Sequence, residues 1–179
     1  MFPLELIHKK IVAADLRHLL IGGQALNTYG SPRTTLDVDF LIPEMDRDSW
    51  QKILSEEGFT LKNDGGNFRQ YAPPYQVDWP LDLMIVNKST FEKLHSASKP
   101  VECLGITTRV PSPEHLIALK VHAIRNGSAA RMEKDFPDIV RLARMTKLDP
   151  DSAAIREIFD RYGNKELYER FLRATKEPN

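Results

Sequence analysis

Several features that would place a protein in a common class are missing from this chain of 179 residues. Its one cysteine, Cys103, excludes a disulfide within the chain, and its apolar neighbours indicate buried packing. Its 25 lysines and arginines balance its 25 aspartates and glutamates, so it lacks the global basic field of dedicated nucleic-acid binders. No stretch approaches the roughly 20 apolar residues of a membrane span, and the N-terminus lacks the apolar run of a signal peptide. We therefore expect a cytoplasmic protein without membrane contact.

The order of the apolar patterns favours an α/β (α+β) fold. We expect a mixed β-sheet flanked by helices over residues 1–110 and a helical C-terminal extension, packed on that core, over residues 111–179. Further helices are expected at residues 4–17, 46–57 and 89–97, a hairpin from residues 59–61 and 68–71, a strand at 105–110, and C-terminal helices at 112–126, 129–145, 151–162 and 164–176. Pro137 is expected to kink the pattern at residues 129–145 or to restart it at Asp135.

A double glycine stands between two predicted secondary structures near the N-terminus. The apolar residues 18–21 form a short buried strand that ends at Gly22 and Gly23, and residues 24–29 have the composition of a short helix. Glycine allows a phosphate to approach the backbone, and a helix N-terminus favours an anion. A tight turn without ligand is the other interpretation of this pattern.

Two acids follow on the next predicted strand, residues 35–42. Residues i and i+2 of a strand point to one face, so Asp37 and Asp39 share a face while Leu36 and the other apolar residues line the opposite one. Two such carboxylates repel each other unless a cation lies between them. Oxygen ligands suit Mg²⁺ or Mn²⁺ better than zinc, although a solvated strand edge would give the same pattern.

A third acid, Asp82, lies in the apolar strand that ends the segment 77–86. Its neighbours point to the other face, and burying an unpaired carboxylate is prohibitive, so Asp82 needs a partner. Asp78 competes for this role, but Pro80 interrupts its segment and Asp82 is preferred. Arg33 could bind phosphate oxygens bidentately. Metal-assisted nucleotidyl transfer needs a turn beside the phosphates, a pair of carboxylates for the metal and a proton acceptor, and this sequence offers all three.

These motifs resemble those of the polymerase-beta-like nucleotidyltransferase superfamily. The matching elements are Gly22-Gly23, Gly30-x-x-Arg33-Thr34, Asp37-x-Asp39 and Asp82. The segments 112–120 and 131–139 are similar to the helical part of the minimal nucleotidyltransferases and of the abortive-infection toxin branch, so the resemblance covers about residues 18–142. The sequence departs from the pattern in two ways: fourteen positions separate Gly23 from Asp37, and Gln24 replaces a commoner serine, histidine or tryptophan.

The resemblance implies a role for each matching residue. Asp37, Asp39 and Asp82 would hold Mg²⁺ or Mn²⁺, with Asp82 as the general base toward the acceptor hydroxyl. The nucleotide would be bound by Gly22, Gly23, Arg33, Thr34 and Lys120. An exposed helix lysine is an equal interpretation of Lys120, and Arg131, Lys134 and Asp135 form a surface charge cluster in the interpretation we prefer.

The implied activity is the transfer of a nucleoside monophosphate from a nucleoside triphosphate (NTP) to an acceptor hydroxyl. The acceptor class stays open among a small molecule, RNA such as tRNA, and a protein, and a toxin-like role would bring a cognate antitoxin as partner. The alternatives are a Mn²⁺-dependent glycosyltransferase and a non-catalytic nucleotide-binding homologue. A zinc site at His115 and His122 is not favoured, because no cysteine or acid stands at ligand spacing.

Overall fold

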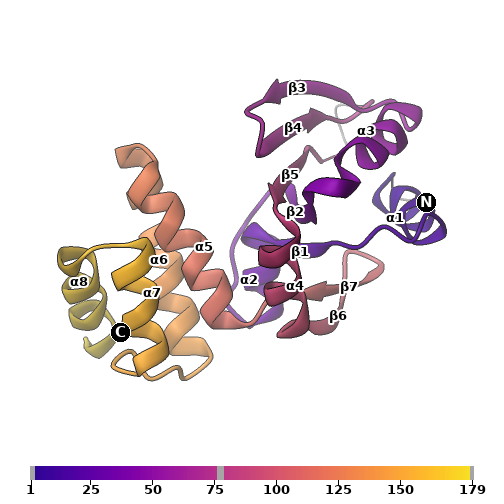
Figure 1. The fold of residues 1–179 in the computed structure, drawn as a ribbon. Coiled ribbons are helices and arrows are strands. Elements are labelled where there is room, and N and C mark those ends of the chain that lie inside the picture. The colour runs from indigo at the N-terminus through magenta and orange to yellow at the C-terminus, as the bar shows by residue number, and fades with distance from the viewer. Residues whose placement is uncertain (1–2, 76–78, 178–179) are drawn as a thin grey trace. The chain divides into compact units, whose positions relative to one another are not determined.

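The computed structural model describes residues 3–75 and 79–177 of the chain (Figure 1). The chain folds into two compact units. The first consists of residues 1–28 and 33–111, and the second of residues 29–32 and 112–179. The first unit carries the strands, and the second consists mainly of helices.

A five-stranded mixed sheet forms the centre of the first unit. Its strands lie in the order β1 (Leu19–Ile21), β2 (Val38–Pro43), β5 (Leu81–Val86), β4 (Phe68–Ala72) and β3 (Thr60–Asp64). The pair β2 and β5 is parallel, and the other pairs are antiparallel. The predicted hairpin is confirmed, because β3 and β4 are antiparallel neighbours.

The apolar residues of β2 and β5 explain why these strands are central. Both strands carry apolar residues on both faces except where an acid interrupts them, as expected of strands covered by helices. The register places Phe40 beside Leu83, and both side chains are buried. It also makes Asp39 and Asp82 direct partners. The core of the sheet therefore fixes the relative position of two of the three acids.

The first unit also contains four helices and a 3-10 turn among its described residues. They are α1 (Pro3–Ala13), α2 (Gly22–Thr28), the 3-10 turn η1 (Glu44–Asp46), α3 (Arg47–Glu56) and α4 (Lys88–Ser96). Helix α3 buries Trp50 completely, and its ring lies 5.6 Å from that of Phe40 in β2, measured between centroids. The Asn87 side chain accepts a hydrogen bond from the amide of Thr90 and so caps α4.

A second, two-stranded sheet consists of β6 (Lys99–Cys103) and β7 (Ile106–Val110). Strand β7 was predicted, whereas β6 was not. Strand β6 is largely exposed and contains Pro100, so it lacks the buried alternation that identifies a strand in a sequence. The connecting residues Leu104 and Gly105 both have positive φ, which is the conformation of a two-residue hairpin turn.

The second unit contains α5 (Pro113–Asn126), α6 (Ala129–Met145), α7 (Ala153–Tyr162) and α8 (Lys165–Lys176). Three of these helices begin at a side-chain cap, provided by Ser112, Ser152 and Asn164. Helix α6 continues without interruption through Pro137, so it does not restart at Asp135, and the alternative of a kink stays a prediction. The rest of the helix outweighs the one backbone hydrogen bond that this proline cannot make. Among the described residues, no helix is long and apolar enough to cross a membrane.

The predicted mixed α/β class is confirmed, but the strand that carries the acids is shorter than expected. It begins at Val38 and not at residue 35. Leu36, expected to line the apolar face, is 70% exposed. The reason is local: the Thr35 hydroxyl donates to the Asp37 carboxylate, and Asn27 hydrogen-bonds to the backbone of Arg33. These contacts hold the segment as a loop until β2 begins.

Candidate active site

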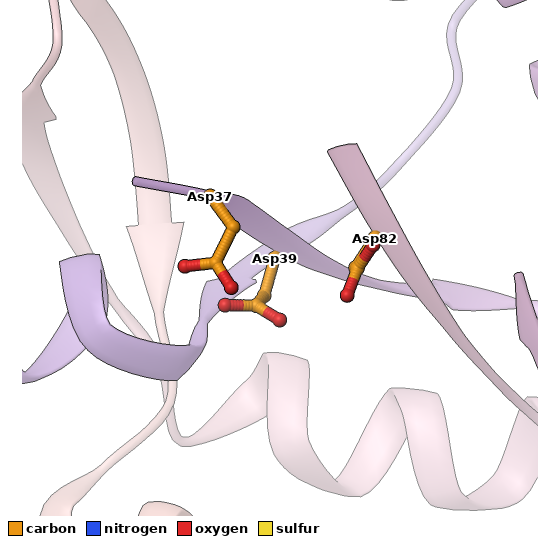
Figure 2. Close-up of side chains that lie close together, drawn as sticks. All are labelled: Asp37, Asp39 and Asp82. Atoms are coloured by element: carbon orange, nitrogen blue, oxygen red, sulfur yellow. The ribbon is translucent and has the colours of Figure 1, made fainter. Parts of the chain in front are cut away.

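Three carboxylates lie together at one place in the first unit. Figure 2 shows Asp37, Asp39 and Asp82 with their side chains directed toward the same region. One oxygen from each residue can be chosen so that all three lie within 4.8 Å of one another. Asp82 is only 8% exposed, whereas the other two are half-buried. The structure thus brings Asp82 together with two acids that stand more than forty positions earlier in the sequence.

Strand pairing accounts for two of these positions and a loop contact for the third. Asp39 in β2 and Asp82 in β5 are register partners on neighbouring parallel strands. Asp37 precedes β2, and its carboxylate accepts a hydrogen bond from the Thr35 hydroxyl. Thr35 is therefore a member of the site that sequence reasoning did not identify, because a threonine at a strand start gives no specific signal.

The double glycine makes room for the acid segment. Gly22 has a φ of +65°, and a Cβ built on it would overlap the Asp39 carboxylate. A Cβ on Gly23 would lie 2.8 Å from Cβ of Thr35. A side chain at either position would displace the acids or the residue that orients them. The sequence predicted these glycines as a phosphate cradle, a role that stays a prediction, and the structure adds this steric reason for them.

Arg33 and Thr34 lie in the loop between α2 and β2. The Asn27 side chain hydrogen-bonds to both backbone groups of Arg33. Its Nδ2 donates to the Arg33 carbonyl at 3.2 Å, and its Oδ1 accepts from the Arg33 amide at 2.8 Å. Arg33 is half-buried and Thr34 exposed. Asn27 is a second residue of the site region that the sequence did not reveal.

Gln70 of β4 is the third missed residue. It is the register partner of Asp82, and its Nε2 donates to Asp82 Oδ2 at 3.1 Å. An amide in an alternating strand looks like any surface residue, so only the pairing of β4 with β5 could have identified it. Gln70 gives the most buried acid of the site the partner that the sequence analysis required.

The residues fit a hard divalent cation. Three carboxylates concentrate negative charge in a small volume, and their oxygens are the donors that Mg²⁺ and Mn²⁺ prefer. Sulfur and imidazole, the usual zinc ligands, are not part of the group. Among the described residues this is the one cluster of at least three such side chains. The competing acid Asp78 lies outside the described residues.

Lys120, expected to contact the nucleotide, lies in α5 with two acidic partners. Its Nζ is 2.7 Å from Asp135 Oδ1 and 2.8 Å from Asp138 Oδ2, both in α6. Lys120 is 9% exposed and each aspartate 2%. The preferred interpretation of Asp135 as part of a surface charge cluster was therefore wrong, although Arg131 does approach its Oδ2 at 3.6 Å.

The other residues noted in the sequence are not members of the acid cluster. His115 and His122 are both in α5, and His122 is exposed with its ring 6.3 Å from that of Tyr162, measured between centroids. Cys103 is half-buried at the end of β6, and burial raises the pKa of its thiol. A raised pKa lowers the thiolate fraction and thus the reactivity of the cysteine.

The fold is that of nucleotidyltransferases. The antibiotic-resistance factor ANT(2'')-Ia has a similar structure, with a TM-score of 0.64 at 15% identity over 94% of this chain and 95% of its own. An antigenic nucleotidyltransferase-like protein from Paracoccidioides brasiliensis gives 0.55 at 17% identity over 97% and 91%. The lincosamide antibiotic adenylyltransferase LnuA, in its lincomycin-bound structure, gives 0.56 at 12% identity over 80% and 96%.

The sequence assigns the chain more narrowly than the fold does. The model of the family described as "uncharacterised nucleotidyltransferase" matches residues 2–178, so the chain belongs to that family. This membership confirms the predicted relationship to polymerase-beta-like nucleotidyltransferases. Comparison with curated protein sequences gives no match.

Proposed function

We propose that this protein is a Mg²⁺- or Mn²⁺-dependent nucleotidyltransferase that moves a nucleoside monophosphate from an NTP to an acceptor hydroxyl. The observation that carries the proposal is the cluster of Asp37, Asp39 and Asp82, whose oxygens lie within 4.8 Å of one another in a chain of this family. Catalysis of this type depends mainly on positioning and electrostatic stabilisation.

Each acid has a proposed part in the transfer. Asp37 and Asp39 hold the cation, and Asp82 completes its ligands and accepts the proton of the attacking hydroxyl. When held by these carboxylates, a divalent cation would supply positive charge to the phosphate oxygens, which favours the departure of pyrophosphate. The acceptor oxygen forms a bond to the α-phosphorus, and the bond from that phosphorus to the β-phosphate oxygen breaks. The hydroxyl proton goes to the Asp82 carboxylate, and the bond electrons leave with pyrophosphate.

The triphosphate is proposed to lie beside the double glycine. Gly22 is in contact range of Asp39, so phosphates on the cation would be close to the backbone of residues 22 and 23. Arg33 and Thr34 follow in the loop that Asn27 holds, and we assign them to the phosphates as well. For Lys120, the two carboxylates on its ammonium support a structural role in the helical unit over a nucleotide contact.

We propose a small hydroxylated molecule as the first acceptor class to test. The chain has no net charge, whereas proteins that bind RNA depend on cationic contacts with phosphates. Two solved structures with this fold carry an adenylylated aminoglycoside, adenylyl-2''-tobramycin, and a lincosamide, lincomycin. Their sequence identities of 14% and 12% make them guides to the fold, so RNA and protein acceptors belong in the same experiment.

The decisive experiment is nucleotide transfer with a matched variant. Purified protein is incubated with each α-labelled NTP, Mg²⁺ or Mn²⁺, and fractions of a cell extract separated into small molecules, RNA and protein. We expect labelling of one fraction by the wild type, loss of labelling with EDTA, and none by the Asp37→Ala/Asp39→Ala variant. As a control, a cooperative thermal unfolding curve should establish that this variant is folded.

Two outcomes would contradict the proposal. Equal labelling by wild type and variant would show that the acids do not catalyse the transfer. Binding of an NTP by the wild type without labelling of any fraction would favour the non-catalytic homologue. Labelling from a sugar nucleotide, with none from the four NTPs, would favour the glycosyltransferase.

A further inference from the structure

A row of polar side chains crosses the sheet from the acid cluster to its edge. Strand register places Asp39, Asp82, Gln70 and Asn63 side by side on β2, β5, β4 and β3. Two hydrogen bonds connect the last three residues: Asn63 Nδ2 donates to Gln70 Oε1 at 3.4 Å, and Gln70 Nε2 donates to Asp82 Oδ2 at 3.1 Å. The exposed edge strand is thereby linked to the least exposed acid of the site.

The chemistry of the groups fixes the direction of this chain of hydrogen bonds. An ionised carboxylate only accepts hydrogen bonds, so the NH₂ group of Gln70 must face Asp82. Its carbonyl oxygen then points the other way and needs a donor, which Asn63 provides. Asn63 thus selects the orientation of the Gln70 amide that suits Asp82. A residue at position 70 without a donor could not replace it.

Strand β4 is held firmly on its other face, so Gln70 is well placed to orient its neighbour. The next residue, Arg69, is 8% exposed and donates from Nε to Asp64 Oδ2 at 3.0 Å. Its Nη1 donates to Gln51 Oε1 in α3 at 2.7 Å. These contacts anchor β4 to the hairpin and to a helix while Gln70 points to the site face.

Resting on the function proposed above, we infer that Gln70 is a positioning residue for Asp82, and that Asn63 supports it from the sheet edge. The amide donor on Oδ2 fixes the plane of the Asp82 carboxylate, so that its remaining lone pairs would be available to the cation and the acceptor hydroxyl. Hydrogen-bond partners of metal ligands typically contribute about 10-fold to 100-fold in affinity or activity. Gln70 needs no contact with substrate to do this.

The test compares Gln70→Leu, which keeps the size but removes the amide, with wild type. At saturating Mn²⁺ we expect kcat to fall about 10-fold to 100-fold while KM for the NTP stays within about 2-fold. The Mn²⁺ dissociation constant, measured on the protein without nucleotide by electron paramagnetic resonance, should rise about 10-fold. The exposed Lys62 of the same strand supplies the control: Lys62→Gln should change neither value.

Two further variants keep the inference falsifiable. Gln70→Glu retains the shape but has no donor and faces Asp82 with a second carboxylate, so its kcat should fall at least as far as that of Gln70→Leu. Asn63→Ala changes an exposed side chain and should lower kcat about 3-fold through the loosened Gln70 amide, a smaller loss because the 3.4 Å contact is weak. If the variants at position 70 do not fold, the kcat of Asn63→Ala decides whether the Gln70 amide positions Asp82.

The outcomes separate the failure of this inference from that of the proposed function. If Gln70→Leu has wild-type thermal stability and both its kcat and its Mn²⁺ dissociation constant stay within about 2-fold, Gln70 does not position Asp82. If the wild type transfers no nucleotide, the proposed function fails, and the Mn²⁺ dissociation constants alone then decide the role of Gln70.

Discussion

The Asp39 carboxylate fills the space that a side chain on Gly22 would need. The glycine has a φ of +65°, in the left-handed region, so both its missing Cβ and its backbone conformation are used. The position of Asp39 thus requires a residue without a side chain at position 22. The contact with Asp39 therefore accounts for a glycine at position 22 independently of any role in binding phosphate.

Replacing this glycine should therefore disrupt the acid cluster. We expect Gly22→Ala to lower the free energy of unfolding by about 3 kcal/mol, because it combines a strained φ with overlap on the Asp39 carboxylate. It should also abolish nucleotide transfer. Urea unfolding and the labelling assay measure the two effects.

The matched control for that substitution is Gly66→Ala. Gly66 has a similar φ of +80°, but a Cβ there would meet nothing within 4 Å. This variant should lose only the conformational cost of about 1 kcal/mol and keep full transfer. Equal losses in the two variants would show that Asp39 is not held against Gly22.

Neutralising one acid should have opposite effects on stability without and with metal. In EDTA, Asp39→Asn relieves repulsion within the three-carboxylate cluster, and we expect the free energy of unfolding to rise by about 1 kcal/mol. With millimolar Mg²⁺ or Mn²⁺, the wild type should gain stability through binding, whereas the variant should gain little. Thermal unfolding over a metal titration measures both. A wild type that is as stable with the cation as in EDTA would argue against the metal site.

Stability should fall in mild acid because of His18. Its ring nitrogens are shielded from solvent, and burial lowers its pKa from 6.5 to about 4. Between these two values the unfolded chain binds more protons than the folded one, so the free energy of unfolding falls as pH drops from about 6.5 to 4, by about 3 kcal/mol.

The variant that isolates this effect is His18→Phe. The ring of His18 contacts those of Phe40 and Trp50 at centroid distances of 4.9 and 5.6 Å, an environment that accepts a phenyl ring. Urea unfolding at several pH values should show a flatter profile for the variant over this range. An unchanged slope would assign the pH dependence to other groups.

The buried charge cluster of the helical unit predicts a large loss for one substitution and recovery by two more. Lys120→Met removes the ammonium that the buried Asp135 and Asp138 carboxylates share, and the free energy of unfolding should fall by about 4 kcal/mol. Adding Asp135→Asn and Asp138→Asn removes the two buried negative charges and should restore most of that loss. Urea unfolding of the single and triple variants measures both changes.

The triple variant also tests the nucleotide contact implied for Lys120 by family resemblance. Because the ammonium is already held by two carboxylates, we expect the triple variant to keep KM for the NTP within about 2-fold of wild type. A rise of 10-fold or more in a stably folded variant would instead place Lys120 at the nucleotide.

The sequence was sufficient to predict β2 and β5, because each is an apolar run that a single acid interrupts. It also predicted the hairpin of β3 and β4 from its glycine-rich turn. It could not predict β6, whose exposed residues and Pro100 leave no buried pattern. It set the start of β2 three residues too early, because the contacts that keep Thr35 and Arg33 in a loop involve side chains from α2 and from the loop itself.

The residues that support the site were missed for a similar reason. Gln70 and Asn63 matter only because strand order places β4 beside β5 and β3 beside β4. Polar residues on half-exposed strands are common, and nothing in their spacing distinguishes these two. Lys120 is the opposite case. Its position in a matching motif suggested a nucleotide contact, but the motif gave no sign of its two acidic partners, which lie 15 and 18 positions further along the chain.

Because Asp39 and Asp82 are partners across β2 and β5, binding of the proposed cation would also report correct strand pairing. Side chains alternate between the two faces of a strand, so pairing these strands one residue out of register would place the two acids on opposite faces. Misregistered molecules would have lost the shared coordination shell even if they were compact and rich in secondary structure. Metal affinity can thus separate native from near-native protein in a preparation where circular dichroism cannot.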